Sequence, residues 1–153
     1  MTDNELMAIA IDLAKQAAAD GEVPVGAVVA RNGEIVATGR NRREKDKNAL
    51  AHAEIEAIDS ACKALGGWRL WECDLFVTLE PCPMCAGAII NSRIRRVVFG
   101  AFDPKAGSCG TVNNLFEFPY NHSPSLVGGF MEDECATLLK DFFAQLRQSK
   151  REK

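Results

Sequence analysis

Apolar residues recur along the chain with two periods, one typical of helices and one typical of strands. At the start, Thr2 and Glu5 form a capping-box pair. The residues after them give one helix an apolar face made of Leu6, Ile9, Ala10, Leu13, Ala14 and Ala17. A second such face lies near the end of the chain and consists of Cys135, Leu138, Leu139, Phe142, Phe143 and Leu146. The pattern therefore predicts an amphipathic helix at each end.

Short apolar runs between these helices indicate strands. Gly26 to Arg31 and Glu34 to Gly39 are joined by Asn32-Gly33, which is a strong hairpin signal. Leu75 to Leu79 and Arg96 to Phe99 are short apolar runs between helical segments, as expected of buried strands. A hairpin followed by alternating strands and helices predicts an α/β protein with a mixed sheet and helices on both faces.

Two further helices are predicted in the middle of the chain. The segment from His52 to Ala64 is rich in alanine, and Asn48 upstream of it is a possible cap. The second helix spans Pro83 to Ile90, and proline is well tolerated in a first turn. Cys82 and Cys85 are three residues apart at its start, so both sulfurs are expected on one face.

His52, Cys82 and Cys85 form a candidate set of zinc ligands. A catalytic zinc site uses three protein ligands and leaves a fourth position for water, whereas a structural site is closed by four. The other cysteines and His122 show no second short spacing that would complete a closed site. Two helix amino ends would also favour thiolates. The sequence therefore predicts an open site with one zinc ion per subunit, which supplies hydroxide near neutral pH.

Glu54 is the candidate proton carrier of this site. Residues two apart in a helix point in different directions, so Glu54 is poorly placed to share the metal with His52. A carboxylate beside zinc-bound water can take its proton and later help to protonate a leaving amine. Backbone N–H groups near Ala53 can donate to a tetrahedral intermediate. The competing interpretation treats the histidine, the glutamate and the Cys-x-x-C pair as unrelated features.

The composition is that of one ordinary globular domain over residues 1–153. Of the 153 residues, 47% are hydrophobic and 25% are charged, which is enough to build a core. We see no membrane-spanning apolar run and no signal-peptide pattern, so we expect a cytoplasmic protein without membrane association. Its six cysteines are expected to be reduced there.

The charge distribution is uneven. A formal net charge of −3 argues against a protein held on nucleic acid by bulk electrostatics. Basic residues nevertheless gather in three groups: Arg40, Arg42, Arg43, Lys45 and Lys47; Arg93, Arg95 and Arg96; Arg147, Lys150, Arg151 and Lys153. Each group alone is typical of a solvated surface. Because two of them flank the candidate metal ligands, we predict a phosphate-facing rim around the site.

The motifs together resemble a known enzyme family. The run His52-Ala53-Glu54 followed by Pro81-Cys82-Pro83-Met84-Cys85 resembles the signature of zinc nucleobase deaminases. Similarity continues in the segments Glu22 to Val28, Gly39 to Arg42, Ala51 to Ile55, Val77 to Ala88 and Ser92 to Ala101, and reaches Phe142-Phe143. Over nearly its whole length the chain resembles the bacterial tRNA-specific adenosine deaminases.

This resemblance implies a cytidine-deaminase-like fold, with three α/β/α layers and a central mixed five-stranded sheet. It implies hydrolytic deamination of the wobble adenosine in a tRNA anticodon, in which zinc-bound hydroxide attacks C6 of adenine and ammonia leaves. His52, Cys82 and Cys85 match the family's zinc ligands, and Glu54 matches its proton shuttle. Further matches to positions near the nucleotide or the RNA are Asn41, Asp103, Lys105 and Phe143.

The resemblance also implies a homodimer that binds the anticodon stem-loop, with the partner subunit helping to form the site. The chain departs from the family at Phe102, where a charged residue is common, and at Ser123, where arginine is usual. These departures bear on the grip on tRNA rather than on the chemistry.

Simpler explanations stay open for some of these residues. A solvated turn around Asp103-Pro104 explains Asp103 and Lys105 equally well, and core packing explains Phe142 and Phe143. Two other functions are also open. One is a deaminase of free bases or nucleosides such as guanine or cytosine, and the other is a zinc-stabilised binding module without activity. Glu54 beside only three ligands argues against the binding module.

Overall fold

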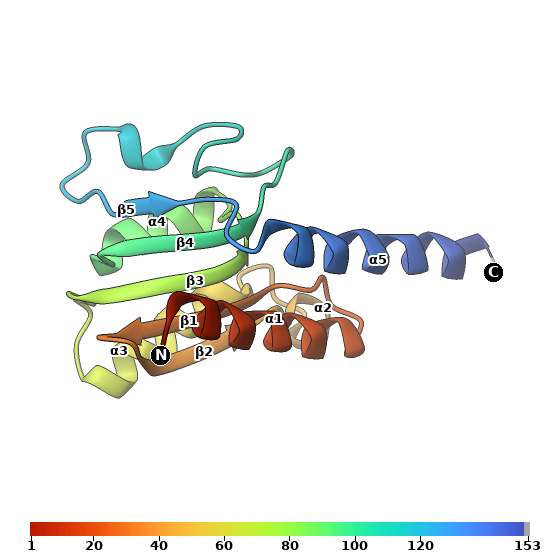
Figure 1. The fold of residues 1–153 in the computed structure, drawn as a ribbon, viewed down its shortest axis with the longest axis horizontal. Coiled ribbons are helices and arrows are strands. Elements are labelled where there is room, and N and C mark those ends of the chain that lie inside the picture. The colour runs from red at the N-terminus through yellow and green to blue at the C-terminus, as the bar shows by residue number, and fades with distance from the viewer. Residues whose placement is uncertain (152–153) are drawn as a thin grey trace.

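The computed structural model describes residues 1–151 and contains a five-stranded sheet with helices on both sides (Figure 1). The elements follow in the order α1 (Asp3–Ala19), β1 (Gly26–Arg31), β2 (Glu34–Arg40), α2 (Arg43–Asp46), α3 (Ala53–Leu65), β3 (Cys73–Leu79), α4 (Pro83–Ser92), β4 (Arg96–Ala101), the short 3-10 helix η1 (Leu115–Glu117), β5 (Ser125–Val127) and α5 (Glu132–Arg151). The strand order is β2-β1-β3-β4-β5. β1 runs antiparallel to β2 and β3, whereas β3, β4 and β5 run parallel. The predicted mixed five-stranded sheet is therefore confirmed.

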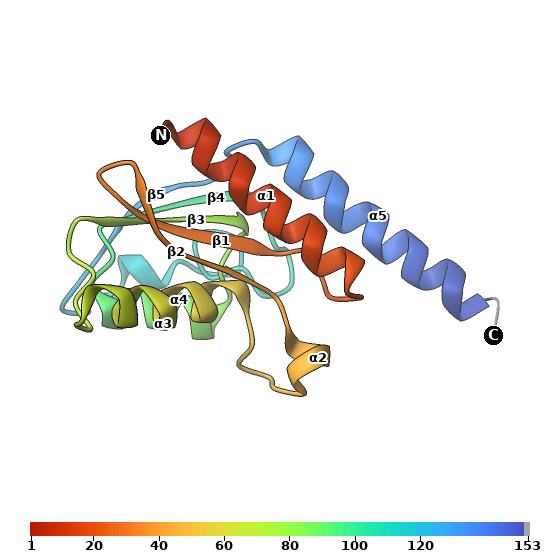
Figure 2. The ribbon, with the colours of Figure 1, turned by 90° about the horizontal axis from the view of Figure 1, so that it is seen from below.

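The sheet separates two apolar layers, because successive side chains of a strand point to opposite faces. In β1, Ala27 and Val29 pack with α3 and α4, while Val28 packs with α1 and α5. In β3, Val77 packs on the side of α3 and α4, and Phe76 packs on the side of α1 and α5. Figure 2 shows α3 and α4 below the sheet and α1 and α5 above it, with α5 running beside α1 and continuing past the body of the protein. The fold therefore has the predicted three α/β/α layers.

The local signals at the start of the chain are confirmed. Thr2 and Glu5 form the full capping box of α1. Asn32 and Gly33 both have positive φ, 53° and 76°, as a tight hairpin turn between right-twisted strands requires. None of the helices described over residues 1–151 is long and apolar enough to cross a membrane.

Four strand ends meet at one edge of the sheet and build the surroundings of the candidate metal ligands. The parallel strands β3 and β4 both end there, β1 begins there, and β2 ends there at Arg40. Gly39 lets β2 lie directly on the first turn of α3, because a Cβ at this position would overlap the carbonyl oxygen of Ala53. This close approach places Asn41 next to the start of α3.

Candidate active site

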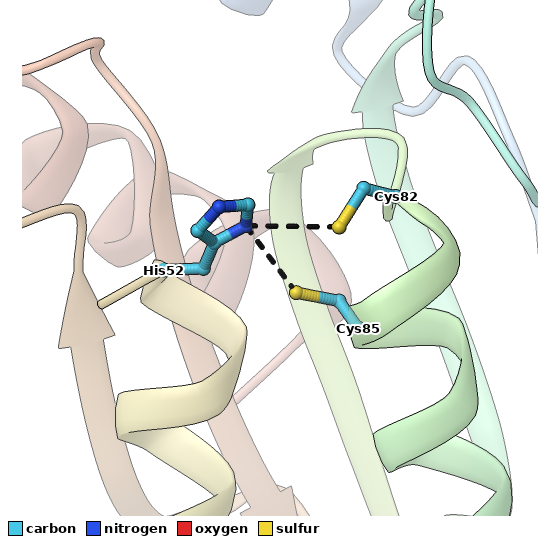
Figure 3. A group of neighbouring side chains, drawn as sticks. All are labelled: His52, Cys82 and Cys85. Atoms are coloured by element: carbon cyan, nitrogen blue, oxygen red, sulfur yellow. Dashed lines mark hydrogen bonds between the residues drawn. The ribbon is translucent and has the colours of Figure 1, made fainter. Parts of the chain in front are cut away.

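The three candidate zinc ligands come together at the amino ends of two helices. His52 is the N-cap residue of α3, Cys82 is the N-cap residue of α4, and neither side chain caps its helix. Nδ1 of His52 lies 3.7 Å from Sγ of Cys82 and 3.5 Å from Sγ of Cys85 (Figure 3). The prediction of Asn48 as the cap of α3 is wrong, because its side-chain oxygen instead accepts a hydrogen bond from the N–H of Leu50.

This cluster fits a zinc ion. Two ligand atoms of a tetrahedral zinc site with bonds of about 2.0 to 2.3 Å lie about 3.5 Å apart, which matches both sulfur–nitrogen distances. All three donor atoms lie within 4.8 Å of one another. Over residues 1–151 this is the one group of three or more histidine, cysteine or acidic side chains placed to hold a metal. Three ligands leave a fourth position open, as a catalytic site requires.

The proton distribution in the cluster also suits a cation. The pKa of Cys82 is lowered to about 4, first by a hydrogen bond from the Cys85 thiol and then by His52. The same contact with Cys82, together with burial, raises the pKa of Cys85. The pKa of His52 is raised, chiefly by its hydrogen bond with Cys82. The Cys82 sulfur therefore carries negative charge that protons on its neighbours stabilise, and a zinc dication held by these residues would supply this stabilisation instead.

Glu54 shares a cavity with these ligands. Its side chain is buried in the first turn of α3 and lines a cavity of about 160 Å³ together with His52 and Cys82. Burial raises the pKa of Glu54 to about 7, with desolvation as the largest cause. A carboxyl group with such a pKa can both accept and donate a proton near neutral pH, as the predicted proton carrier must.

Asn41 lines the same cavity and holds the start of α3. Its side-chain oxygen accepts a hydrogen bond of 2.9 Å from the N–H of Ala53. The Ala53 N–H that we predicted as a donor to the substrate is thus already bonded in this structure. A substrate atom reaches it only if the Asn41 amide turns away. Asn41 and Ala53 therefore act as one unit at the cavity wall.

The other residues predicted to contact the substrate, Asp103, Lys105 and Phe143, lie at different distances from the cavity: one lines it, one lies outside it and one lines its neighbour. Asp103 lines the cavity and also makes the predicted turn, because its Oδ1 accepts hydrogen bonds from the N–H groups of Lys105 and Ala106 at 3.0 and 3.2 Å. Lys105 is exposed and is not among the residues that line the cavity. Phe143 is 39% exposed and lines an adjoining cavity of about 250 Å³. Asn41 lines both cavities, so the two are neighbours.

Comparisons with known proteins agree with this site. Residues 1–101 match the family model of the cytidine and deoxycytidylate deaminase zinc-binding region. The tRNA-specific adenosine deaminase of Bacillus subtilis is 54% identical over 153 residues, which cover 99% of this chain and 95% of that protein. The chain belongs to this zinc-dependent deaminase family. The deaminase is therefore a zinc enzyme, and the residues at its metal cluster have the donor types that zinc requires.

Solved structures show the same fold. One, from a study of A-to-I editing by tRNA:A34 deaminases at the wobble position of transfer RNA, has a TM-score of 0.86 and 43% identity to the deaminase, and the match covers 89% of this chain and 99% of that one. The guanine deaminase of Bacillus subtilis has a TM-score of 0.66 and 30% identity, covering 97% and 95%. The cytidine-deaminase-like architecture is thus confirmed, and it is shared by enzymes with different named substrates.

The basic group of Arg93, Arg95 and Arg96 does not form part of the predicted rim. Arg95 and Arg96 stand at the start of β4, and five strand residues place Arg96 about 16 Å from the edge that carries the metal cluster. Both bind Asp74, at 3.1 and 3.0 Å, and Arg96 also binds Asp3 of α1 at 2.9 Å. The prediction that this group flanks the site is wrong, because Arg95 and Arg96 both bind Asp74 of β3 and Arg96 also ties α1 to the sheet.

The first basic group is also partly used within the deaminase. Arg42 binds Glu56 at 3.0 Å, and this contact raises the pKa of Arg42. Arg40 binds Asp20 at 3.3 Å. Arg43 lines both the cavity that contains Glu54 and the adjoining cavity that contains Phe143. Arg147, Lys150 and Arg151 are exposed on the last turns of α5, and Lys153 lies outside the described residues.

Two buried acids near the cavity were missed by the sequence analysis. Glu22 and Glu80 are each 2% exposed. Each stands beside apolar residues and proline, in Glu22-Val23-Pro24 and Leu79-Glu80-Pro81. A lone acid in such surroundings is the signal that could have marked them, because charged groups are rarely buried without partners.

Proposed function

We propose that the deaminase converts adenosine to inosine at the wobble position of a tRNA anticodon. The observation that carries this proposal is the 54% identity to a tRNA-specific adenosine deaminase over nearly the full length of both chains. The cluster of His52, Cys82 and Cys85 beside buried Glu54 supports it, because hydrolytic deamination needs an activated water and a proton carrier.

We propose a role for each of these residues, which its position supports. His52, Cys82 and Cys85 hold zinc, which supplies a water molecule whose pKa is lowered toward about 7. Glu54 takes a proton from the attacking water and delivers protons to the ring nitrogen and the leaving amine. A C–O bond forms first at C6, which gives a tetrahedral carbon; the bond to the protonated exocyclic nitrogen then breaks, so ammonia leaves and the oxygen stays as the carbonyl of inosine. Asn41 orients the base at the wall it shares with Ala53.

We propose that the neighbouring residues receive the flipped nucleotide and its surroundings. A base that reacts in a pocket must leave its stack, so the nucleotides beside it need a second surface. The adjoining cavity offers Phe143 for stacking and Arg43 for a phosphate. Asp103 contacts the nucleotide from the opposite loop, while exposed Lys105 is free to meet the RNA backbone outside the cavity.

We further propose a cytoplasmic homodimer. Several large apolar side chains are at least half exposed: Leu50, Val112, Phe118 and Tyr120. A second copy that covers some of these side chains would account for their exposure. Sedimentation at micromolar concentration is expected to give twice the chain mass, and a monomer at that concentration would contradict this part of the proposal.

A direct test separates the proposed substrate from the alternative of a free-base deaminase. Purified enzyme is incubated separately with an anticodon stem-loop carrying A34, adenosine, guanine and cytosine. We expect ammonia and inosine from the stem-loop, and turnover of the free compounds at least about 100-fold lower, because RNA contacts outside the base position it. A stem-loop carrying G34 is the matched control. Faster turnover of guanine would replace the proposal with the alternative.

Substitutions of Arg96 and Arg43 are expected to have different effects, the first on stability and the second on RNA binding. Arg96→Ala removes charge-assisted hydrogen bonds to Asp3 and Asp74, so we expect it to lower the free energy of unfolding by about 2 kcal/mol and to leave stem-loop affinity unchanged. Arg43→Ala should do the reverse, with affinity about tenfold lower and stability retained. Urea denaturation and stem-loop binding at fixed salt measure both. Equal loss of affinity in the two variants would contradict the assignment.

A further inference from the structure

The Glu80 carboxylate holds one wall of the cavity through backbone hydrogen bonds. It accepts from the N–H groups of Asp103, Cys109 and Thr111 at 3.1, 3.0 and 3.0 Å, and also from the Thr111 hydroxyl. These donors span the loop after β4, and Asp103 on that loop lines the cavity. A single side chain therefore fixes a segment that otherwise contains little regular structure.

The loop is shaped around this carboxylate. A Cβ at Gly107 would overlap the Glu80 carboxyl group, so only glycine leaves room for it there. No residue within 1–151 forms an ion pair with Glu80, and the hydrogen-bond donors to its carboxylate all belong to the loop. The carboxylate thus serves as an anchor for backbone N–H groups.

Glu22 makes the same kind of contact on the other side. Its two carboxylate oxygens accept from the N–H groups of Glu44 and Lys45 at 3.1 and 2.9 Å. These N–H groups belong to α2, which carries Arg43 to the cavity. The loop after β4 and helix α2, which both lie beside the cavity, are therefore each held by one buried acid.

Stability alone explains these acids poorly. Burying a carboxylate is costly, and its hydrogen bonds to backbone N–H groups offset that cost rather than leave a large surplus of stability. What the carboxylate offers is several acceptor positions aimed at N–H groups, which fix a loop in one conformation. That is what a site needs when its walls are built from loops, because small displacements there lower the rate.

We propose that Glu80 and Glu22 are positioning residues, which hold the loop after β4 and helix α2 in place so that Asp103 and Arg43 meet the nucleotide. This inference rests on the proposed function for its substrate. Neither glutamate is assigned a contact with the reacting atoms. Their loss should therefore weaken substrate binding more than it slows the chemistry at Glu54 and zinc.

The test uses Glu80→Gln, Glu22→Gln and Gly107→Ala in the full chain, with Asp74→Asn as the matched control. Asp74 is also a buried acid, but it holds Arg95 and Arg96 at the opposite edge of the sheet. Gly107→Ala displaces the Glu80 carboxylate without removing it. Kinetics with the A34 stem-loop, zinc content, thermal stability and backbone amide hydrogen exchange are measured for each variant.

For Glu80→Gln we expect the KM for the stem-loop to rise about tenfold, with kcat within about threefold of wild type and one zinc per chain. Amides of Asp103, Cys109 and Thr111 should exchange faster, whereas those of Glu44 and Lys45 should respond only to Glu22→Gln. Gly107→Ala should reproduce the Glu80→Gln pattern. Asp74→Asn should lower thermal stability and leave KM and kcat unchanged.

Unchanged exchange of the loop amides in Glu80→Gln would overturn the inference, and so would a loss of stability with unchanged KM in both glutamate variants. A wild type that does not deaminate the stem-loop would reject the proposed function instead. The exchange measurement needs no turnover, so the two failures can be told apart.

Discussion

Replacing Glu54 with glutamine is expected to lower turnover at least about 1,000-fold while the fold and the zinc content stay intact. The carboxyl group is buried beside the metal cluster, and its pKa of about 7 lets it take and return protons near neutral pH. Proton transfer by a positioned side chain typically contributes about 10²- to 10⁴-fold, and here one group serves several steps. Glutamine keeps the shape of the side chain but cannot carry a proton. The measurement is kcat at saturating stem-loop, with zinc per chain determined on the same sample.

Glu56→Gln is the matched control for this variant. Glu56 is two residues further along α3 and faces Arg42 rather than the cavity. The same chemical change there should leave kcat within about twofold, since a partly exposed ion pair contributes little. Near-normal turnover of Glu54→Gln would show that another group moves the protons. Loss of zinc in that variant would show that Glu54 belongs to the metal site.

The layers of this fold could be predicted because the apolar pattern reports burial directly. β1 and β3 are covered on both faces, and the hairpin turn depends on two neighbouring residues, Asn32 and Gly33. β5 was not predicted from the residues. It has three residues, Ser125–Val127, and exists because it pairs with Arg96–Val98. A strand this short is defined by its pairing partner, because three residues are too few to show the alternation of apolar and polar residues that identifies a strand.

The metal cluster was predictable for a different reason. Its residues occupy the N-cap positions and first turn of two helices, and helix starts are visible in short stretches of sequence. Charge partners are not local in this way. Arg96 binds Asp3, which lies 93 positions away along the chain. The basic run that contains Arg96 was predicted to face RNA, but Arg96 instead holds α1 against the sheet. The hydrogen bonds of Glu80 to the loop after β4 are hidden from sequence for the same reason.

Removing one cysteine ligand is expected to abolish both zinc binding and activity. In Cys85→Ala, His52 and Cys82 remain, and two ligands rarely hold zinc against a buffer, so we expect less than about one tenth of a zinc ion per chain after dialysis. Turnover should fall by a similar or larger factor, since no activated water is supplied. Cys82→Ala should behave in the same way. Metal analysis and stem-loop deamination on one preparation measure both effects.

Cys135→Ala distinguishes this effect from the general loss of a buried thiol. Cys135 is 1% exposed, and burial raises its pKa to about 11, but it packs between α5 and the sheet, on the face opposite α3 and α4. We expect this variant to keep one zinc per chain and normal turnover, with a small loss of stability. Full zinc in Cys85→Ala would mean that the ion is held elsewhere. Because His52 would then have no partner besides Cys82, the open three-ligand site would have to be abandoned together with the role of Glu54 beside it.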